Sequence, residues 1–200
     1  MNAEQQKKNK IMSILMKTEV SMVAIIAIIF IAASLGTQNF LTAYNLTNIL
    51  KQCAIIGIIS IAETYVIITA GIDISCEAIV GMSTLIVAMS QAKWGLSVPV
   101  SLLLGILLAI ISGVFNAALV YEFRVPAFVA TLGSQTILRG LIKVISNGGT
   151  VAGINKSFAG FASTSVGFIP NLAIVWFVIA VICFLILKYT IFGRNLFVLG

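Results

Sequence analysis

Long apolar runs alternate with short polar stretches along most of the chain. Six such runs cover residues 20–36, 46–70, 78–91, 98–120, 125–145 and 171–187. A helix that crosses a bilayer needs about 20 predominantly apolar residues, and most of these runs are near that length. The pattern therefore predicts an all-α fold, a polytopic membrane helix bundle with about six transmembrane helices.

Polar side chains interrupt the fifth run at a helical spacing. The run reads VPAFVATLGSQTILRGLIKVI, and Thr131, Gln135 and Arg139 in it are spaced i, i+4 and i+8. On a helix these three fall roughly on one face. Since an arginine that faces lipid alone is costly, we expect this face to point toward protein or a water-filled cavity. The two interpretations are a polar contact that joins helices and the lining of a wet cavity, and both require a protected interior.

A polar segment, GIDISCE at residues 71–77, separates the second and third runs. One interpretation is a tight cytoplasmic turn in which Asp73 or Ser75 caps the next helix. The other is an interrupted membrane helix that lines a pathway, because irregular backbone is tolerated in such a place. Glu63, deep in the second run, is expected to be protonated, paired or facing a cavity.

Small residues recur at helical spacing in the fourth run, which predicts close packing against another helix. They are Ser101, Gly105, Ala109, Ser112, Gly113 and Asn116. Asn116 is the member of this set that is the best candidate for a role beyond packing.

The distribution of basic residues predicts the orientation in the membrane. With a cytoplasmic N-terminus, six spans also place the C-terminus in the cytoplasm. The basic residues that then face the cytoplasm are Lys7, Lys8, Lys10, Lys17, Arg124, Lys188 and Arg194, against Lys51, Lys93, Lys143 and Lys156 outside. The positive-inside rule favours this arrangement. We expect a basic cytoplasmic N-terminus at 1–19, the transmembrane domain at 20–189 and the start of a cytoplasmic loop at 190–200.

Composition excludes several classes of function. The chain is 60% hydrophobic and 9% charged, whereas soluble domains carry about 25% charged residues. It contains no histidine and no GxxxxGK[ST] motif, so neither a Ser/His/Asp triad nor a P-loop is present in the sequence. We expect no enzyme activity, no cofactor and no metal site. The net charge of +6 is spread along or beside the apolar runs, so we expect the lipid bilayer and no nucleic acid as a partner.

Three stretches together resemble one protein family. TYVIITAGIDIS at 64–75 resembles the pattern T-x-V-I-L-T-G-G-I-D-L-S, and FGRN at 192–195 resembles the FGR that follows the sixth span. The run GVFNAALVYEFRVPAFVATLGSQTILRGL at 113–141 resembles G-x-x-N-G-x-L-V-x-x-x-x-[IV]-P-x-F-[IV]-x-T-L-G-x-x-x-[IL]-x-R-G-L. The family is the permease subunit of bacterial ATP-binding-cassette sugar importers of the ribose/xylose/galactose type, which also includes permeases for autoinducer-2 and related polyols.

The resemblance implies a permease subunit in the bacterial plasma membrane that translocates a ribose-type pentose or a hexose by alternating access. Its implied partners are separate cytoplasmic ATPase subunits, an extracytoplasmic sugar-binding protein, and a second permease copy or paralogue. Candidate residues that line or support the pathway are Asp73, Asn116, Thr131, Gln135 and Arg139; all but Gln135 fall on motif positions of the family.

The chain also departs from the family pattern. Cys76 and Glu77 stand where valine and glycine usually follow GIDLS, and Glu63 stands where an uncharged residue is more frequent. Family members continue with further spans after the FGR loop, so the chain is expected to be truncated after six spans. Two rival functions follow: a truncated membrane scaffold that does not transport, and a proton-coupled secondary transporter that uses Glu63.

Overall fold

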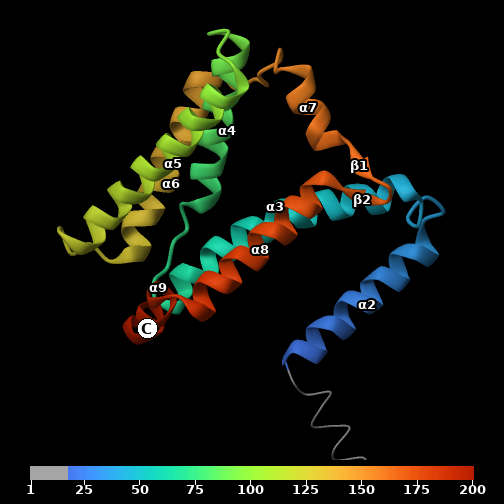
Figure 1. Cartoon of the computed structure of the whole chain (residues 1–200), viewed down its shortest axis with the longest axis horizontal. Helices are drawn as coiled ribbons and strands as arrows, with labels where there is room; N and C mark the ends of the chain where they lie inside the picture. The colour runs from blue at the N-terminus through green and yellow to red at the C-terminus, as the bar shows by residue number, and fades with distance from the viewer. Residues whose placement is uncertain (1–17) are drawn as a thin grey trace, which may run out of the picture. The chain divides into compact units, whose positions relative to one another are not determined.

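The structure, a computed structural model, describes residues 18–200, and the chain divides into two compact units, residues 1–49 and 50–200. Most of the predicted basic N-terminus therefore lies outside the described residues. The elements of the described part are α2 (Thr18–Gly36), α3 (Ala43–Ile68), α4 (Cys76–Ala92), α5 (Val98–Tyr121), α6 (Ala127–Ser146), α7 (Lys156–Ser163), β1 (Ser165–Val166), β2 (Ile169–Pro170), α8 (Asn171–Tyr189) and α9 (Ile191–Leu199). Figure 1 shows helices throughout, with one short hairpin, β1–β2, between α7 and α8.

The predicted all-α polytopic bundle is confirmed. Four helices, α3, α5, α6 and α8, are long and apolar enough to cross a membrane. The other two predicted spans are also helices, but the apolar stretches Val20–Gly36 and Cys76–Ala92 are shorter. The cytoplasmic location of both termini stays a prediction.

In the first unit, side-chain contacts fix the connection from α2 to α3. The rings of Phe30 and Phe40 meet edge to face at 5.0 Å, and the Asn45 amide donates to the Phe40 carbonyl at 2.8 Å. The Thr42 hydroxyl accepts from the Asn45 backbone N–H at 3.3 Å. A threonine oxygen in this place satisfies one of the free N–H groups of a first helical turn, which explains why α3 begins at Ala43.

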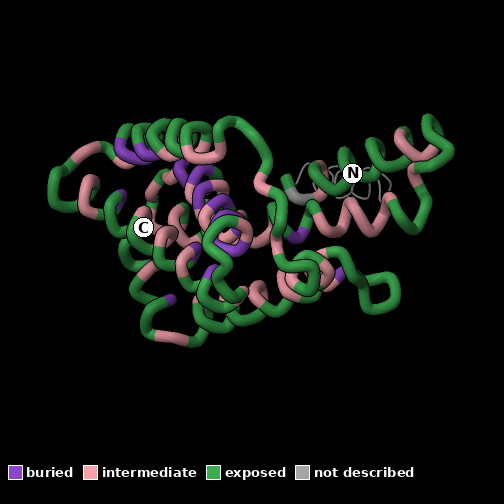
Figure 2. Tube along the Cα trace, turned by 90° about the horizontal axis from the view of Figure 1, so that it is seen from above, coloured by how far each residue is buried: buried purple, intermediate pink, exposed green. Residues whose placement is uncertain are grey.

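In the second unit, α4 is the most buried helix and packs against both α5 and α6. The buried segments in Figure 2 are concentrated along one helix, and seven of the buried residues belong to α4. The packing is centred on Met82, Leu85 and Met89. Around them lie apolar residues of α5, α6 and the loop after α6: Leu108, Leu138, Ile142, Ile145 and Val151.

The small residues of α5 contribute unequally to this packing. At Gly105 a Cβ would lie 2.6 Å from Val87 Cγ2 and 3.3 Å from the Ser83 carbonyl oxygen, so glycine lets α5 approach α4 closely. Ser101 and Asn116 are buried as well. Gly113 is exposed, and no atom lies within 4 Å of a Cβ added to it. The close-packing surface of α5 is therefore narrower than the spacing of small residues indicates.

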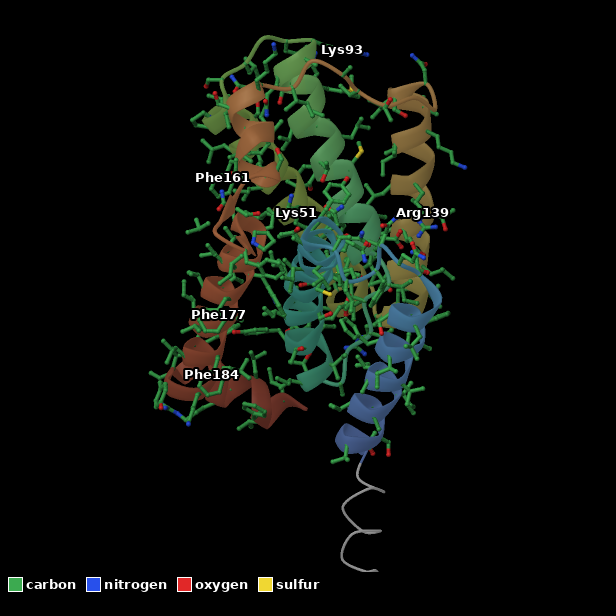
Figure 3. The ribbon with its side chains drawn as sticks, turned by 90° about the vertical axis from the view of Figure 1, so that its right-hand side faces the viewer. Lys51, Lys93, Arg139, Phe161, Phe177 and Phe184 are labelled. Carbon is green, nitrogen blue, oxygen red and sulfur yellow. The ribbon has the colours of Figure 1, made fainter. Side chains whose placement is uncertain are left out.

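A second pair of helices, α3 and α8, lies side by side (Figure 1). The Trp176 indole covers Gly57 so closely that a Cβ there would overlap it, and the Tyr65 hydroxyl donates to the Cys183 carbonyl at 2.7 Å. No residue of α8 is buried, and Phe177 and Phe184 are both exposed (Figure 3). An apolar exposed surface on a membrane helix is what contact with lipid or further helices requires.

The predicted loop at 146–170 contains a short helix, α7. The Asn155 side chain caps it by accepting from the backbone N–H groups of Ser157 (2.9 Å) and Phe158 (3.3 Å). Gln91 at the end of α4 accepts from the Asn155 N–H at 3.1 Å, and Lys51 of α3 donates to the Ser163 carbonyl at 2.9 Å. The loop is thus attached to α4 at one end and to α3 at the other.

Residues 190–200, expected as the start of a cytoplasmic loop, contain the short helix α9, and their cytoplasmic location stays a prediction. The Thr190 hydroxyl accepts from the Gly193 N–H at 3.2 Å and so caps α9. Gly193 is buried against the backbone of Leu187, where any Cβ would overlap it. The glycine of the FGRN motif is what allows α9 to turn this tightly after α8.

Candidate functional site

The candidate site begins at the break between α3 and α4. The Gly71 N–H donates to the Val66 carbonyl (3.0 Å) and the Ala70 N–H to the Ile67 carbonyl (2.9 Å). This pair of bonds is the Schellman pattern that closes a helix C-terminus, and it requires a left-handed residue at position 70. Ala70 adopts φ 54°, a conformation that glycine would reach without strain. The chain then runs without helical structure to Ser75.

Asp73 organises the turn that leads into α4. One oxygen of its carboxylate accepts from both the Ser75 backbone N–H (2.7 Å) and the Ser75 hydroxyl (2.6 Å). The other oxygen lies 3.8 Å from the Cys76 Sγ, and the Cys76 side chain also lies near the Glu63 carboxyl. A carboxylate at a helix N-terminus is stabilised by the free N–H groups and by the helix dipole. Asp73, rather than Ser75, is therefore the side chain that receives hydrogen bonds from this turn.

Asn116 connects this turn to the other two helices of the group. Its amide nitrogen donates to the Ser75 hydroxyl at 2.7 Å, and its amide oxygen accepts from the Ser134 hydroxyl of α6. Ser75 is fully buried, and Asn116 and Ser134 are each 7% exposed. The result is a directed chain of hydrogen bonds, Ser134 to Asn116 to Ser75 to Asp73, in which each buried polar group has a partner.

This network lies inside the helix group rather than at its end. Asn116 is 5 residues before Tyr121, the last residue of α5, and Ser134 is 7 residues after Ala127, the first of α6. At a rise of 1.5 Å per residue, the network lies roughly 8–10 Å inside the ends of α5 and α6. Since α4 begins at this depth, residues 71–75 enter the group as non-helical chain. The segment has the form of the second sequence interpretation, an interrupted membrane helix. It also contains a turn closed by Asp73, but Ser75, at the N-cap position of α4, makes no side-chain capping hydrogen bond.

Arg139 forms an ion pair with Glu77. Arg139 Nη2 and Glu77 Oε2 are 2.6 Å apart, and their side chains are 52% and 74% exposed. Arg139 lies about midway along α6 (Figure 3), and Glu77 is in the first turn of α4. Within residues 18–200 this is the one ion pair between side chains. Glu77, which departs from the family pattern, is thus the partner of Arg139, which matches that pattern.

The remaining predicted site residues do not join the network. Thr131 is buried, and its hydroxyl donates to the Ala127 carbonyl of its own helix at 2.8 Å. Gln135 is half-buried, and its side chain makes no hydrogen bond to other described residues. The structure therefore brings together Asp73 with Asn116, and Arg139 with Glu77, but it gives Thr131 and Gln135 no shared partner.

Two apolar hollows lie on the group formed by α4, α5 and α6. One, of about 360 Å³, lies between α4 and α5 and is bordered by Phe158 of α7. The other, of about 210 Å³, lies between α5 and α6, and Ser134 forms part of its wall. Both are lined mainly by aliphatic side chains, which offer few partners to a polar solute. Among the described residues, no cluster of three or more His, Cys, Asp or Glu side chains could hold a metal ion.

A membrane-spanning helix group that is interrupted at a buried polar network is typical of a membrane transport protein. Comparison with known proteins gives the same class. The family described as "Branched-chain amino acid transport system / permease component" matches residues 45–200, and the chain belongs to this family. It is a multi-pass protein of the bacterial inner membrane, as the sequence predicts. No solved structure matches the chain.

Individual relatives are permeases of sugar importers. The chain is 32% identical to the ribose import permease of Bacillus subtilis (strain 168) over 86% of its own length and 54% of the relative. It is 33% identical to the D-allose transport permease of Escherichia coli (strain K12), over 88% and 54% respectively. For the xylose transport permease of Haemophilus influenzae the identity is 31%, over 85% and 47%. The chain thus spans about half the length of these relatives, and the predicted resemblance to sugar permeases is confirmed.

Proposed function

We propose that the chain is the membrane-spanning permease subunit of an ATP-binding-cassette importer for a monosaccharide, a ribose-type pentose or a hexose. The observation that carries this proposal is its similarity, over more than four fifths of its length, to permeases for ribose, xylose and allose. The sequence has no P-loop, so the ATPase activity belongs to separate cytoplasmic subunits. An extracytoplasmic sugar-binding protein and a second permease subunit complete the proposed assembly.

The geometry supports alternating access by movement of groups of helices. The hydrogen bonds of Asn116 hold α4, α5 and α6 together, and Tyr65 and Trp176 hold α3 against α8. Residues 69–75 connect the two groups without helical structure. Hinges in closing proteins are usually a few residues at element ends, and this segment fits that description. The network then keeps one group rigid while the connecting segment absorbs the change.

Uptake by the source bacterium tests the proposal. Deleting the gene for this chain should abolish accumulation of radiolabelled ribose, xylose or allose, and a plasmid copy of the intact gene should restore it. A strain that takes up all three sugars at the parental rate after the deletion would contradict the importer function. That result would favour the rival function of a membrane scaffold that does not transport.

A specific observation favours a second candidate, the proton-coupled transporter. Glu63 is half-buried in α3 and has no cationic partner within the described part of the chain. A carboxyl in such a place can take up and release a proton during transport. The variant Glu63→Gln cannot do so, and it should abolish uptake if this candidate is right. Unchanged uptake by Glu63→Gln would exclude it.

A further inference from the structure

From Gln135 onward, the exposed surface of α6 is divided into a polar side and an apolar side. The polar side carries Gln135, Thr136, Arg139 and Lys143, and the apolar side carries Ile137, Leu141 and Val144. At 3.6 residues per turn, the first set falls within about 100° of the helix circumference and the second within about 60°. Nearer the start of α6 the sector of the polar side carries the exposed apolar residues Phe128 and Leu132, so the polar side is confined to the C-terminal part of the helix. A helix surrounded by lipid has no reason for this division, because all of its exposed surface meets the same solvent.

The apolar side has the composition of a lipid-facing surface. Ile137 and Val144 are 59% and 73% exposed, and Leu141 lies between them on the same side of the helix. The polar side has the opposite character, since two of its four residues are cationic and Arg139 is paired with Glu77 of α4. The Arg139 pair lies near the middle of the helix, where an exposed charge in hydrocarbon is most costly.

The polar side has hydrogen-bonding groups that the described residues leave available to water or to a polar solute. A guanidinium has five N–H donors, and the Arg139 side chain has one described partner, the Glu77 carboxylate. The Gln135 amide has none among residues 18–200, and the Thr136 hydroxyl donates only to the Leu132 carbonyl of its own helix. In a water-free contact these groups would each cost the free energy of an unsatisfied buried donor or acceptor.

We propose that the side of α6 formed by Gln135, Thr136 and Arg139, together with Glu77, lines the water-filled translocation pathway, while the side with Ile137 faces lipid. This inference rests on the proposed transport function. It adds Glu77 and Thr136 to the pathway and gives the ion pair a role in selectivity. The charges of Arg139 and Glu77 cancel, so this part of the lining carries no net charge, although Lys143 adds a positive charge about one turn further along α6. The donors and acceptors of Gln135, Thr136 and the ion pair match the hydroxyl groups of a neutral polyhydroxy solute.

Cysteine accessibility at two adjacent positions tests the inference. Thr136→Cys and Ile137→Cys place a thiol at the same depth, on the polar and the apolar side respectively. Each full-length variant is treated in intact membranes with a charged, membrane-impermeant methanethiosulfonate. Because the chain has three native cysteines, the labelling of the parent chain is subtracted. The thiolate is the reactive form and needs water to exist, so Thr136→Cys should react at least about tenfold faster than Ile137→Cys.

A second matched pair, Lys143→Cys and Val144→Cys, repeats the comparison about two turns further along α6. It covers the case in which one variant of the first pair fails to assemble. Equal and slow labelling within both pairs would overturn the inference, because the polar side would then be covered by protein or lipid. Equal and fast labelling would overturn it as well, since α6 would be surrounded by water.

The uptake measurement distinguishes failure of the inference from failure of the proposed function. If sugar uptake depends on the chain but the labelling is symmetric, the pathway lies elsewhere and the importer function stands. If the labelling is asymmetric but no sugar is taken up, α6 lines a water-filled space in a protein of another function. D-ribose, added at concentrations that increase in tenfold steps, should slow the labelling of Thr136→Cys in proportion to the fraction of pathways that the sugar occupies. The labelling rate of Ile137→Cys should stay unchanged.

Discussion

Asn116 of α5 is hydrogen-bonded both to Ser75, next to α4, and to Ser134 of α6. Replacing it with alanine removes the donor to the Ser75 hydroxyl and the acceptor of the Ser134 hydroxyl in one step. Each of these bonds contributes about 0.6–1 kcal/mol, the lower figure being the average for bonds between membrane helices. The lost side-chain volume leaves a small cavity, and the total destabilisation should be about 2 kcal/mol.

Thermal unfolding of the purified chain in detergent measures this change. A change of about 2 kcal/mol in a chain of this size lowers the apparent Tm by roughly 4–8 °C. Ser112→Ala is the matched control, one turn earlier on α5, because the Ser112 hydroxyl donates only to the Leu108 carbonyl of its own helix. The control should lie within about 1 °C of the parent chain.

The isosteric variant Asn116→Asp separates hydrogen bonding from packing. It keeps the shape and the acceptor for Ser134, but it replaces the donor to Ser75 with an oxygen. The Ser75 hydroxyl already donates its proton to Asp73, so the new oxygen meets a lone pair and adds a second carboxyl near Asp73. Asn116→Asp should therefore lower the Tm at least as much as Asn116→Ala. The reasoning is refuted if Asn116→Asp is as stable as the parent chain, because packing alone would then explain the site.

Three further changes have definite expected outcomes. Ala70→Gly should raise the apparent Tm by roughly 1–4 °C, because Ala70 has φ 54° and glycine removes up to about 1 kcal/mol of strain; an unchanged or lower Tm would show that α3 does not end as described. Gly105→Val should lower the free energy of unfolding by about 1–3 kcal/mol, because its side chain would displace Val87 and meet the Ser83 carbonyl. The same thermal assay measures this change. The control is Gly113→Val, which has open space around it and should leave the stability nearly unchanged. In a double-mutant cycle, Glu77→Gln and Arg139→Gln should each lower the free energy of unfolding, and the double variant should lose less than the sum of the two. The expected coupling energy between the two side chains is about 1 kcal/mol. Strictly additive effects would mean that the ion pair contributes nothing to stability.

The sequence predicts the helices well because apolar runs of bilayer length have few alternatives to a helix in lipid. Asn116 and Arg139 could be singled out because each is a polar residue in an apolar run, and Asp73 because it lies in the polar segment between two runs. The pairing of Asn116 with Ser75 and Ser134, and of Arg139 with Glu77, could not be predicted, because each pair joins different elements and only the packing of α4 against α5 and α6 selects it. A signal for the Arg139 partner was available in its charge: Glu77 is the acidic residue of α4.

Two features of the fold could not be predicted from the sequence, because they depend on contacts that leave no pattern along the chain. The helix α9 depends on Thr190 as a cap and on the close approach of Gly193 to Leu187, and neither contact produces an apolar run. The spacing of small residues in α5 predicts one continuous packing surface, but Gly113 is exposed, and it lies about 80° around the helix from Gly105, the residue that packs closely on α4. Spacing identifies the residues that allow close packing, whereas the position of the neighbouring helices decides which of them are used.

The source of energy for uptake tests the central claim most directly. Cells that express the chain are depleted of ATP with arsenate while respiration maintains the proton gradient, and a second sample keeps ATP but loses the gradient to a protonophore. An importer of the ATP-binding-cassette class should lose chain-dependent uptake of labelled ribose, xylose or allose in the first sample and keep it in the second. Uptake that survives ATP depletion and disappears with the gradient would contradict the account and assign transport to proton coupling.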